Sequence, residues 1–167
     1  MSAFSTPRLQ HRKVSGPALQ KNGLTIQNAK LTDAPALAAL MCELGYETTS
    51  AEMRRRLKPI LRDGRYRTFL AEVDGKVCGM IGTLAYHSFA HNEPGGRIVT
   101  LVVRRDSRRL GVGRSLVAAV EKDFVGRAIK RVGLDTRLTR EDAHHFYESL
   151  GYKRNGWRFV KELSMSD

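Results

Sequence analysis

The stretch RRLGVGRSLV, from Arg108 to Val117, places two glycines between arginines and a run of apolar residues with helical spacing. Glycine is a poor helix former, so a helix that begins around Gly111 and Gly113 indicates close approach of the backbone to a ligand. The N–H groups at a helix start and the positive end of the helix dipole bind anions, and Arg108 and Arg114 would add charge-assisted donors. The pattern therefore predicts a phosphate-binding turn.

Two common phosphate loops do not fit this stretch. The pattern G-x-x-x-x-G-K-[ST] is absent, and the dinucleotide pattern G-x-G-x-x-G fails because Leu116 occupies the third glycine position. What remains is R-x-x-G-x-G, formed by Arg108, Gly111 and Gly113. Taken alone, this short pattern is equally compatible with a glycine turn that serves only close packing.

Strands and helices alternate around the turn. Residues 97–103, RIVTLVV, are β-branched and nearly all apolar, which predicts a central strand covered on both faces. Apolar residues follow helical spacing after Gly111, and residues 131–136 predict a short strand. The glycine turn therefore joins the end of a central strand to the start of a helix, where backbone N–H groups collect.

Local signals predict the remaining elements. Thr49 stands three residues before Glu52, a capping box that opens a helix, and Asp74-Gly75 between two apolar runs is a strong hairpin signal. We expect helices at 34–44, 49–64 and 140–150, strands at 24–29 and on both sides of the hairpin, and an alternating final strand at 157–163. This order predicts one mixed α/β domain over residues 24–167.

The composition excludes several classes of protein. With 167 residues and 41% apolar content, we expect a single globular domain. No run approaches the roughly 18 apolar residues of a membrane helix, and residues 1–23, an expected disordered basic tail, contain no apolar signal core. Cys42 and Cys78 form neither a C-x-x-C pair nor a disulfide framework, so we expect buried thiols. These features predict a cytoplasmic protein that does not bind membranes.

The formal net charge of +12 points first toward nucleic acid, because Lys and Arg supply most non-specific affinity for phosphates. Five basic residues and no acid precede Asp33, so part of the excess lies in the tail. The run from Arg54 to Arg56 fits the solvated face of a helix. The distribution therefore disfavours nucleic acid as a partner, and the charge equally suits a small polyanionic ligand.

Two stretches together resemble a known family. LVVRRDSRRLGVGRSLV, from Leu101 to Val117, and REDAHHFYESLGY, from Arg140 to Tyr152, closely resemble the acyl-CoA-binding core of the GNAT N-acetyltransferase superfamily. The resemblance implies a mixed sheet of six to seven strands with about four helices and a splayed central pair of strands. It also implies acetyl transfer from acetyl-CoA to a primary amine, by direct attack within a ternary complex.

The resemblance implies a site for acetyl-CoA. A bulge in the central strand would free backbone groups to pair with the pantetheine arm, and the pyrophosphate would lie on N–H groups at the helix start. The implied contacts are Leu101, Val102 and Val103 for pantetheine, and Arg108, Arg109, Leu110, Gly111, Val112, Gly113, Arg114 and Ser115 for the phosphates. Ala143 and Tyr147 match further family positions. Arg140 stands where many members have asparagine, and an arginine there would reach a phosphate instead.

The implied reaction needs three groups. A neutral amine attacks the thioester, the N–H of Val103 stabilises the developing oxyanion, and the Tyr147 phenol donates a proton to the CoA thiolate. The alternative for Tyr147 is a core aromatic residue. In the histone-type branch a glutamate early in the central strand takes the proton of the ammonium, but that position here is Arg97. The base stays open between Glu47, His87, Glu93, Asp135 and water.

We expect a small-molecule amine to bind between two loops, the link after the first helix and the loop after the third strand. Their acids and aromatics suit a cationic acceptor and are Tyr46, Glu47, His87 and Glu93. We expect no metal site, because the adjacent His144 and His145 point to different sides of a helix. A homodimer is a further expectation. The alternative function is an inactive GNAT-like module that binds CoA or nucleic acid.

Overall fold

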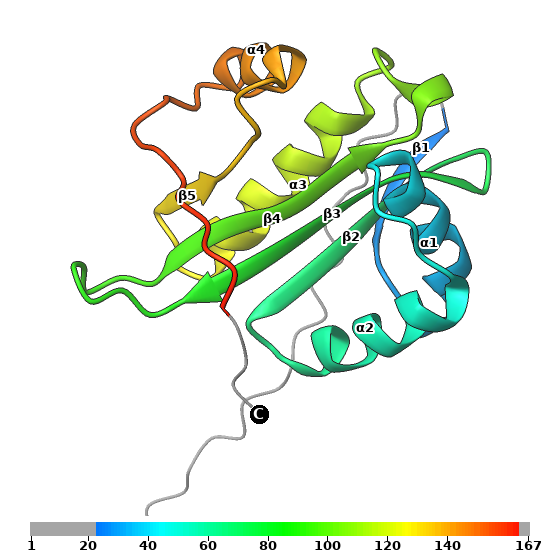
Figure 1. Ribbon diagram of the computed structural model, residues 1–167, viewed down its shortest axis with the longest axis horizontal. Helices are drawn as coiled ribbons and strands as arrows, with labels where there is room; N and C mark the ends of the chain where they lie inside the picture. The colour runs from blue at the N-terminus through cyan, green and yellow to red at the C-terminus, as the bar shows by residue number, and fades with distance from the viewer. Residues whose placement is uncertain (1–22, 164–167) are drawn as a thin grey trace, which may run out of the picture.

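A mixed five-stranded sheet forms the centre of the structure (Figure 1). A computed structural model describes residues 23–163, and the predicted tail at 1–23 lies outside the described residues except for Gly23. The strands lie in the order β1 (Leu24–Asn28), β2 (Tyr66–Val73), β3 (Lys76–Tyr86), β4 (Gly95–Val103) and β5 (Arg131–Leu134). The first four strands pair in antiparallel fashion, and β5 pairs parallel to β4.

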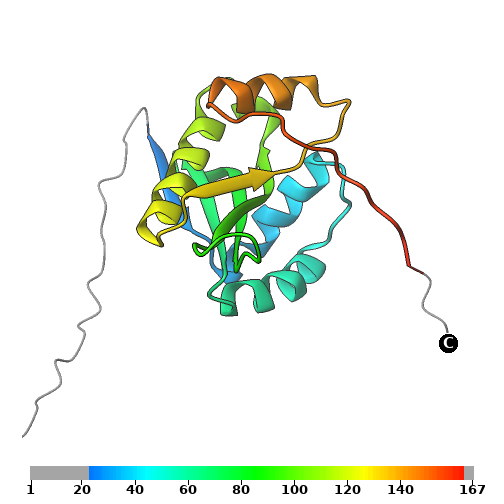
Figure 2. The same cartoon turned by 90° about the vertical axis from the view of Figure 1, so that its left-hand side faces the viewer.

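Helices cover both faces of the sheet. Figures 1 and 2 show α1 (Ala34–Glu43) and α2 (Ser50–Arg62) on one face and α3 (Val112–Gly126) on the other. The helix α3 connects β4 to β5, as a parallel pair of strands requires. The last helix, α4 (Glu141–Ser149), follows β5 and lies beyond the end of that strand. The arrangement confirms the mixed α/β fold expected from the sequence.

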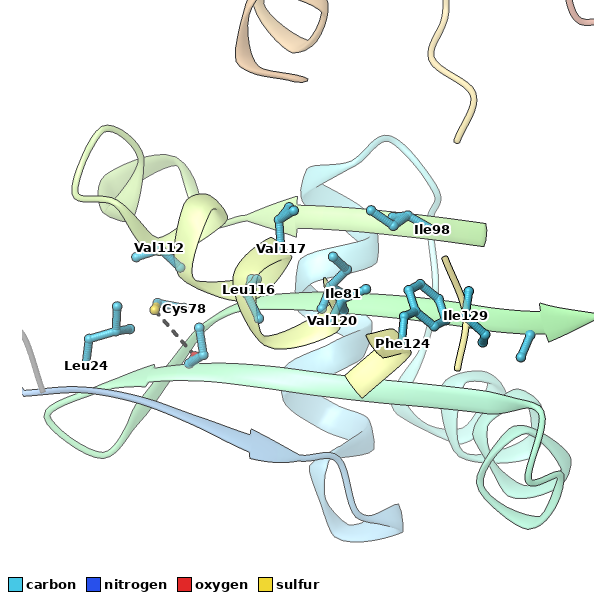
Figure 3. Packing of buried hydrophobic residues seen from close by; sticks show 12 residues of the cluster. Leu24, Cys78, Ile81, Ile98, Val112, Leu116, Val117, Val120, Phe124 and Ile129 are labelled. Atoms are coloured by element: carbon cyan, nitrogen blue, oxygen red, sulfur yellow. Dashed lines mark hydrogen bonds between the residues drawn. The ribbon is translucent and has the colours of Figure 1, made fainter. Parts of the chain in front are cut away.

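Each face of the sheet has its own apolar core. Figure 3 shows the core beneath α3, where Leu116, Val120 and Phe124 pack against β3 and β4. The other core lies beneath α1 and α2 and includes Val102 of β4. The Phe124 side chain is 0% exposed, and a Cβ added at Gly96 would lie 2.9 Å from its ring. Glycine at the start of β4 therefore makes room for α3.

Local sequence signals produced the expected structure. The Thr49 hydroxyl accepts a hydrogen bond from the Glu52 N–H at 3.2 Å, and the Glu52 carboxylate accepts one from the Thr49 N–H at 2.9 Å. This reciprocal capping box opens α2. Asp74 and Gly75 both have positive φ angles, 50° and 76°, as a two-residue hairpin turn between β2 and β3 requires.

The expected final strand is absent. Residues 157–163 alternate as a strand should, but they form no ladder, and the side chains of Trp157 and Phe159 are 76% and 91% exposed. A strand needs a neighbouring edge, and alternation alone does not supply one. The described sheet therefore has five strands, one fewer than the lower limit of the expected six to seven.

The two cysteines differ in burial. Cys78 is buried, and burial raises the pKa of its thiol. Cys42 is exposed, contrary to expectation, because it lies on the outward side of α1 near its end. Within residues 23–163, no helix combines the length and the apolar content needed to cross a membrane.

Candidate active site

The end of β4 has an unpaired edge. The last pair between β4 and β5 joins Ile98 to Leu134, whereas β4 continues to Val103. The pairing between β3 and β4 also shifts register, because Gly82 pairs with Thr100 and Thr83 pairs with Ile98. Val99 is therefore the extra residue of a β-bulge, which bends a strand and ends regular pairing. The geometry agrees with the splayed strand pair that the resemblance implied.

Backbone groups alternate in direction along this edge. The Arg104 N–H donates to the Cys78 carbonyl at 2.8 Å, so Arg104 faces β3. In an antiparallel ladder alternate residues face the same neighbour. Val102, the partner of Met80, therefore also faces β3, while Leu101 and Val103 present their N–H and C=O groups to the unpaired side. The expectation that Val102 offers free backbone groups is corrected by this register.

A tight turn follows β4 and leads into α3. Gly111, the residue before the helix, has a φ of +82°, and no atom lies within 4 Å of a Cβ added there. This left-handed conformation explains the glycine. Within the described part of the chain, no side chain caps the start of α3. The first N–H groups of the helix, from Val112 onward, therefore face the turn and suit an anion.

Gly113 serves packing between helices. A Cβ added at Gly113 would lie 3.2 Å from the Phe146 ring of α4 and 3.7 Å from the Val103 side chain. The structure shows that this glycine lets α4 approach, and the role that the sequence suggested, close approach of the phosphate, stays a prediction. Tyr147 follows Phe146 directly, so the contact also sets the position of the predicted acid.

Arginines surround the turn. The Arg108 Nε donates to the Val103 carbonyl at 3.1 Å, which places its guanidinium beside the unpaired edge. Arg114 contacts the Ser149 hydroxyl of α4 at 3.4 Å. The predicted phosphate contacts Arg109 and Leu110 are exposed, Ser115 is half-buried and Val112 has its side chain in the core. The side chain of Val112 is therefore not available to a ligand, whereas its backbone N–H is.

Tyr147 of α4 lies in a cluster of three aromatic residues. Its ring contacts Phe146 and Tyr152 edge to face, with centroid distances of 5.1 Å and 5.6 Å. Burial raises the pKa of Tyr147 to about 12, and the nearby charge of Arg140 lowers it by a smaller amount. The phenol therefore stays protonated at neutral pH. Arg140 also pairs with Asp142 at 3.3 Å, and Ala143 is half-buried in the first turn of α4.

The four predicted acceptor residues fall into two groups. Tyr46 and Glu47 follow α1, whose last residue contacts Arg105 just after β4. His87 and Glu93 lie in the loop that precedes β4. Because β4 has nine residues at about 3.3 Å each, these groups lie near opposite ends of the strand. The structure does not bring them together.

Two candidate bases are already engaged in ion pairs. The Glu93 carboxylate accepts from Lys130 Nζ at 2.9 Å, and this hydrogen bond lowers the pKa of Glu93. Asp135 accepts from Arg97 and lies 3.6 Å from Arg158 Nε. Sequence reasoning missed this cluster, although the unusual Arg97 was a signal. Glu47 and His87 are exposed and stay open as bases, together with water.

A cavity of about 180 Å³ lies beneath α2, on the face of the sheet opposite α3. It extends over Gly82 to the bulge at Val99 and Thr100. The Thr100 hydroxyl oxygen is buried, and no hydrogen-bond partner for it exists among the described residues. Within residues 23–163, no group of three or more His, Cys, Asp or Glu side chains could hold a metal ion.

Comparisons with known proteins agree with this geometry. Residues 34–152 match the Acetyltransferase (GNAT) family. An aminoalkylphosphonate N-acetyltransferase of Salmonella typhimurium is 32% identical over 139 residues, which are 83% of this chain and 90% of that protein. Human N-acetyltransferase 8 is 31% identical over 91 residues, which are 54% of this chain and 40% of that protein.

Solved structures share the fold. An aminoglycoside acetyltransferase from an uncultured soil metagenomic sample has a TM-score of 0.74 at 19% identity and covers 86% of this chain and 98% of its own. A transcriptional regulator from Bacillus halodurans has a TM-score of 0.78 at 21% identity, over 84% of this chain and 99% of its own. The chain belongs to the GNAT acetyltransferase family. It is an acyl-CoA-dependent N-acyltransferase.

Proposed function

We propose that the protein transfers an acetyl group from acetyl-CoA to the primary amine of a small molecule, by direct attack within a ternary complex. One observation carries the proposal: Arg108, in the turn before α3, contacts the Val103 carbonyl, so the outward backbone groups of β4 and the uncapped N–H groups of α3 lie beside each other along one path. A ligand with an extended amide-containing arm and a pyrophosphate fits this path. Acetyl-CoA, the cosubstrate of the GNAT family, has both parts.

Different residues of the chain would bind the two parts of acetyl-CoA. Leu101 and Val103 would pair with the amides of the pantetheine arm, as a neighbouring strand does. The N–H groups from Arg109 to Arg114 would hold the pyrophosphate, with Arg108 and Arg114 adding charge-assisted hydrogen bonds. When the arm binds, Arg108 must release the Val103 carbonyl, to which it now donates.

Two groups would act on the reacting atoms. The outward N–H of Val103 or Leu101 would donate to the thioester oxygen as negative charge develops there. The Tyr147 hydroxyl would donate to the departing thiolate. Because its pKa of about 12 lies above that of a thiol, Tyr147 is a weak acid for complete proton transfer and a good hydrogen-bond donor.

The acceptor is proposed to be a small molecule. The relative from Salmonella typhimurium is named for acetylating aminoalkylphosphonates, and it matches most of this chain. That similarity supports an acceptor of similar size. Val99 and Thr100, at the bulge, lie where an amine would meet the thioester beside Leu101.

Calorimetric titration with acetyl-CoA tests the cosubstrate, with desulfo-CoA as a ligand that lacks the thioester. A second assay follows the release of free thiol with a panel of primary amines. Micromolar binding together with amine-dependent thiol release supports the proposal. Binding without release for every amine would favour the alternative, an inactive CoA-binding module.

A cytoplasmic location and a homodimer are further proposals. The exposed apolar side chains of Trp157, Phe159, Val160 and Leu163 support association with a second copy. Sedimentation of the full chain measures this directly. A monomer at all concentrations would contradict the dimer.

A further inference from the structure

Three charged side chains meet where β4 and β5 part. The Asp135 carboxylate accepts a hydrogen bond from the Arg97 guanidinium and lies 3.6 Å from Arg158 Nε. Arg97 belongs to β4, Asp135 follows β5, and Arg158 belongs to the segment after α4. The three residues are far apart in the sequence, and the fold alone brings them together.

The cluster lies on the face of the sheet opposite α3. Ile98 points into the core beneath α3, so its neighbour Arg97 points to the opposite face of the sheet. Figures 1 and 2 show that the chain after α4 passes along this same face, which α1 and α2 also cover. An acceptor that enters from this face meets the cluster beside the bulge.

The cluster is a short distance from the reacting atoms. Asp135 follows Leu134, the partner of Ile98, so its carboxylate lies about level with Val99. Leu101 is two residues further along the strand, or roughly 7 Å. A short alkyl chain spans a gap of this size, at about 1.5 Å per bond.

The charges around the cluster favour an anion. Two guanidinium groups share one carboxylate, so the cluster has a net charge of +1, and the side chain of Arg158 is 64% exposed. Glu93, the predicted acid of the acceptor loop before β4, is already paired with Lys130. A second cation on the acceptor would therefore be repelled, whereas an oxyanion would gain charge-assisted, bidentate hydrogen bonds.

We propose that Arg97 and Arg158 bind an oxyanion group of the acceptor amine, with Asp135 orienting both guanidinium groups. The inference rests on the proposed function and names its substrate class: a short primary amine that carries a phosphonate, phosphate or carboxylate. It differs from the expectation that the acids and aromatics of two loops bind a cationic acceptor. Arg97 and Arg158 are specificity-determining residues, and Asp135 is a positioning residue.

The test compares three amines of similar length: aminoethylphosphonate, propylamine and diaminopropane. Transfer is followed by thiol release, and binding is followed by calorimetry with CoA-saturated protein. We expect aminoethylphosphonate to have a kcat/KM at least tenfold above that of the other two. Equal values for the three amines would overturn the inference while leaving the proposed function intact. Binding of aminoethylphosphonate without transfer would support the anion site and contradict the proposed function.

Variants assign the effect to the cluster. Arg97→Gln and Arg158→Gln should each raise the KM for aminoethylphosphonate about tenfold and leave that for propylamine unchanged, since each removes a charge-assisted contact. Arg154→Gln is the matched control, because Arg154 lies in the same segment as Arg158 and pairs with Glu148 of α4. Arg158 is exposed, so its variant tests the inference even where Arg97→Gln disturbs folding. An equal loss for propylamine would contradict the assignment. β-Alanine in place of aminoethylphosphonate shows whether a carboxylate suffices.

Discussion

The carboxylate of Glu43, the last residue of α1, accepts a hydrogen bond from the backbone N–H of Arg105 at 2.8 Å. Arg105 lies between the end of β4 and the glycine turn. The bond therefore ties the loop that is proposed to bind the pyrophosphate to α1, on the face of the sheet opposite α3. Glu43 is a positioning residue for that loop.

Replacing Glu43 should weaken acetyl-CoA binding. We expect Glu43→Ala to raise the Kd for acetyl-CoA about threefold to tenfold, because a hydrogen bond of about 0.5–1.5 kcal/mol no longer holds the loop. Glu43→Gln keeps an acceptor oxygen and should bind within about twofold of the wild type. Calorimetry measures both, and unchanged affinity in Glu43→Ala would show that the loop needs no such tie.

The left-handed Gly111 gives a prediction about charge. Asn tolerates positive φ angles better than most residues, and the space around Gly111 is open, so Gly111→Asn and Gly111→Asp should fold alike. We expect Gly111→Asp to bind acetyl-CoA at least tenfold more weakly than Gly111→Asn, because its carboxylate would face the pyrophosphate. Equal affinities would place the pyrophosphate elsewhere.

Gly113 gives a prediction about geometry. In Gly113→Ala the added methyl group presses on Phe146, which must shift by a few tenths of an ångström. Because Phe146 adjoins Tyr147, kcat should fall several-fold while the Kd for acetyl-CoA changes little. Adding Phe146→Leu should restore part of the loss. If instead acetyl-CoA affinity collapses and kcat is kept, Gly113 serves the phosphate after all.

Tyr147→Phe tests the donor to the thiolate. The substitution keeps the ring contacts, so acetyl-CoA affinity should hold, while kcat falls about tenfold or more. Since the pKa of Tyr147 is about 12, the wild-type rate should show no loss from its titration below about pH 10. Full activity of Tyr147→Phe would show that Tyr147 serves only as an aromatic residue of the core.

The same pKa predicts a pH dependence of stability. In the unfolded chain a phenol loses its proton near pH 10, whereas Tyr147 in the folded chain holds it to about pH 12. The folded state therefore binds more protons in this window, and the free energy of unfolding falls as the pH rises through it. Denaturant unfolding of wild type and Tyr147→Phe should show a steeper decline for the wild type. Parallel curves would contradict this.

Phe124 carries a large share of the core beneath α3. Its side chain is 0% exposed, so Phe124→Ala should lower the free energy of unfolding by about 3–5 kcal/mol. For a domain of this size the Tm would fall by roughly 6–20 °C. Calorimetric melting measures the change. A decrease in the free energy of unfolding below about 1 kcal/mol would mean that neighbouring side chains repack into the space left by the ring.

Sequence reasoning succeeded where the signal is local. The Asp74-Gly75 turn and the Thr49 cap depend on residues a few positions apart, and both formed. The strand expected at 157–163 depends on a partner edge, which alternation cannot reveal. The contact of Arg97 with Asp135 needs the register of β4 against β5, and the separation of Tyr46 from His87 needs the direction of β4. These are relations between segments that are far apart in the sequence, and local patterns in a single sequence do not predict them.

An unpaired strand edge inside a sheet is usually a hazard, because its free N–H and C=O groups can template pairing with another chain. The edge at Leu101 and Val103 carries that hazard for as long as no ligand covers it. A bound pantetheine arm would act as a missing strand, so CoA should slow aggregation on heating as well as serve chemistry. If acetyl-CoA binds along this edge as proposed, the solubility of the protein should depend on its cosubstrate.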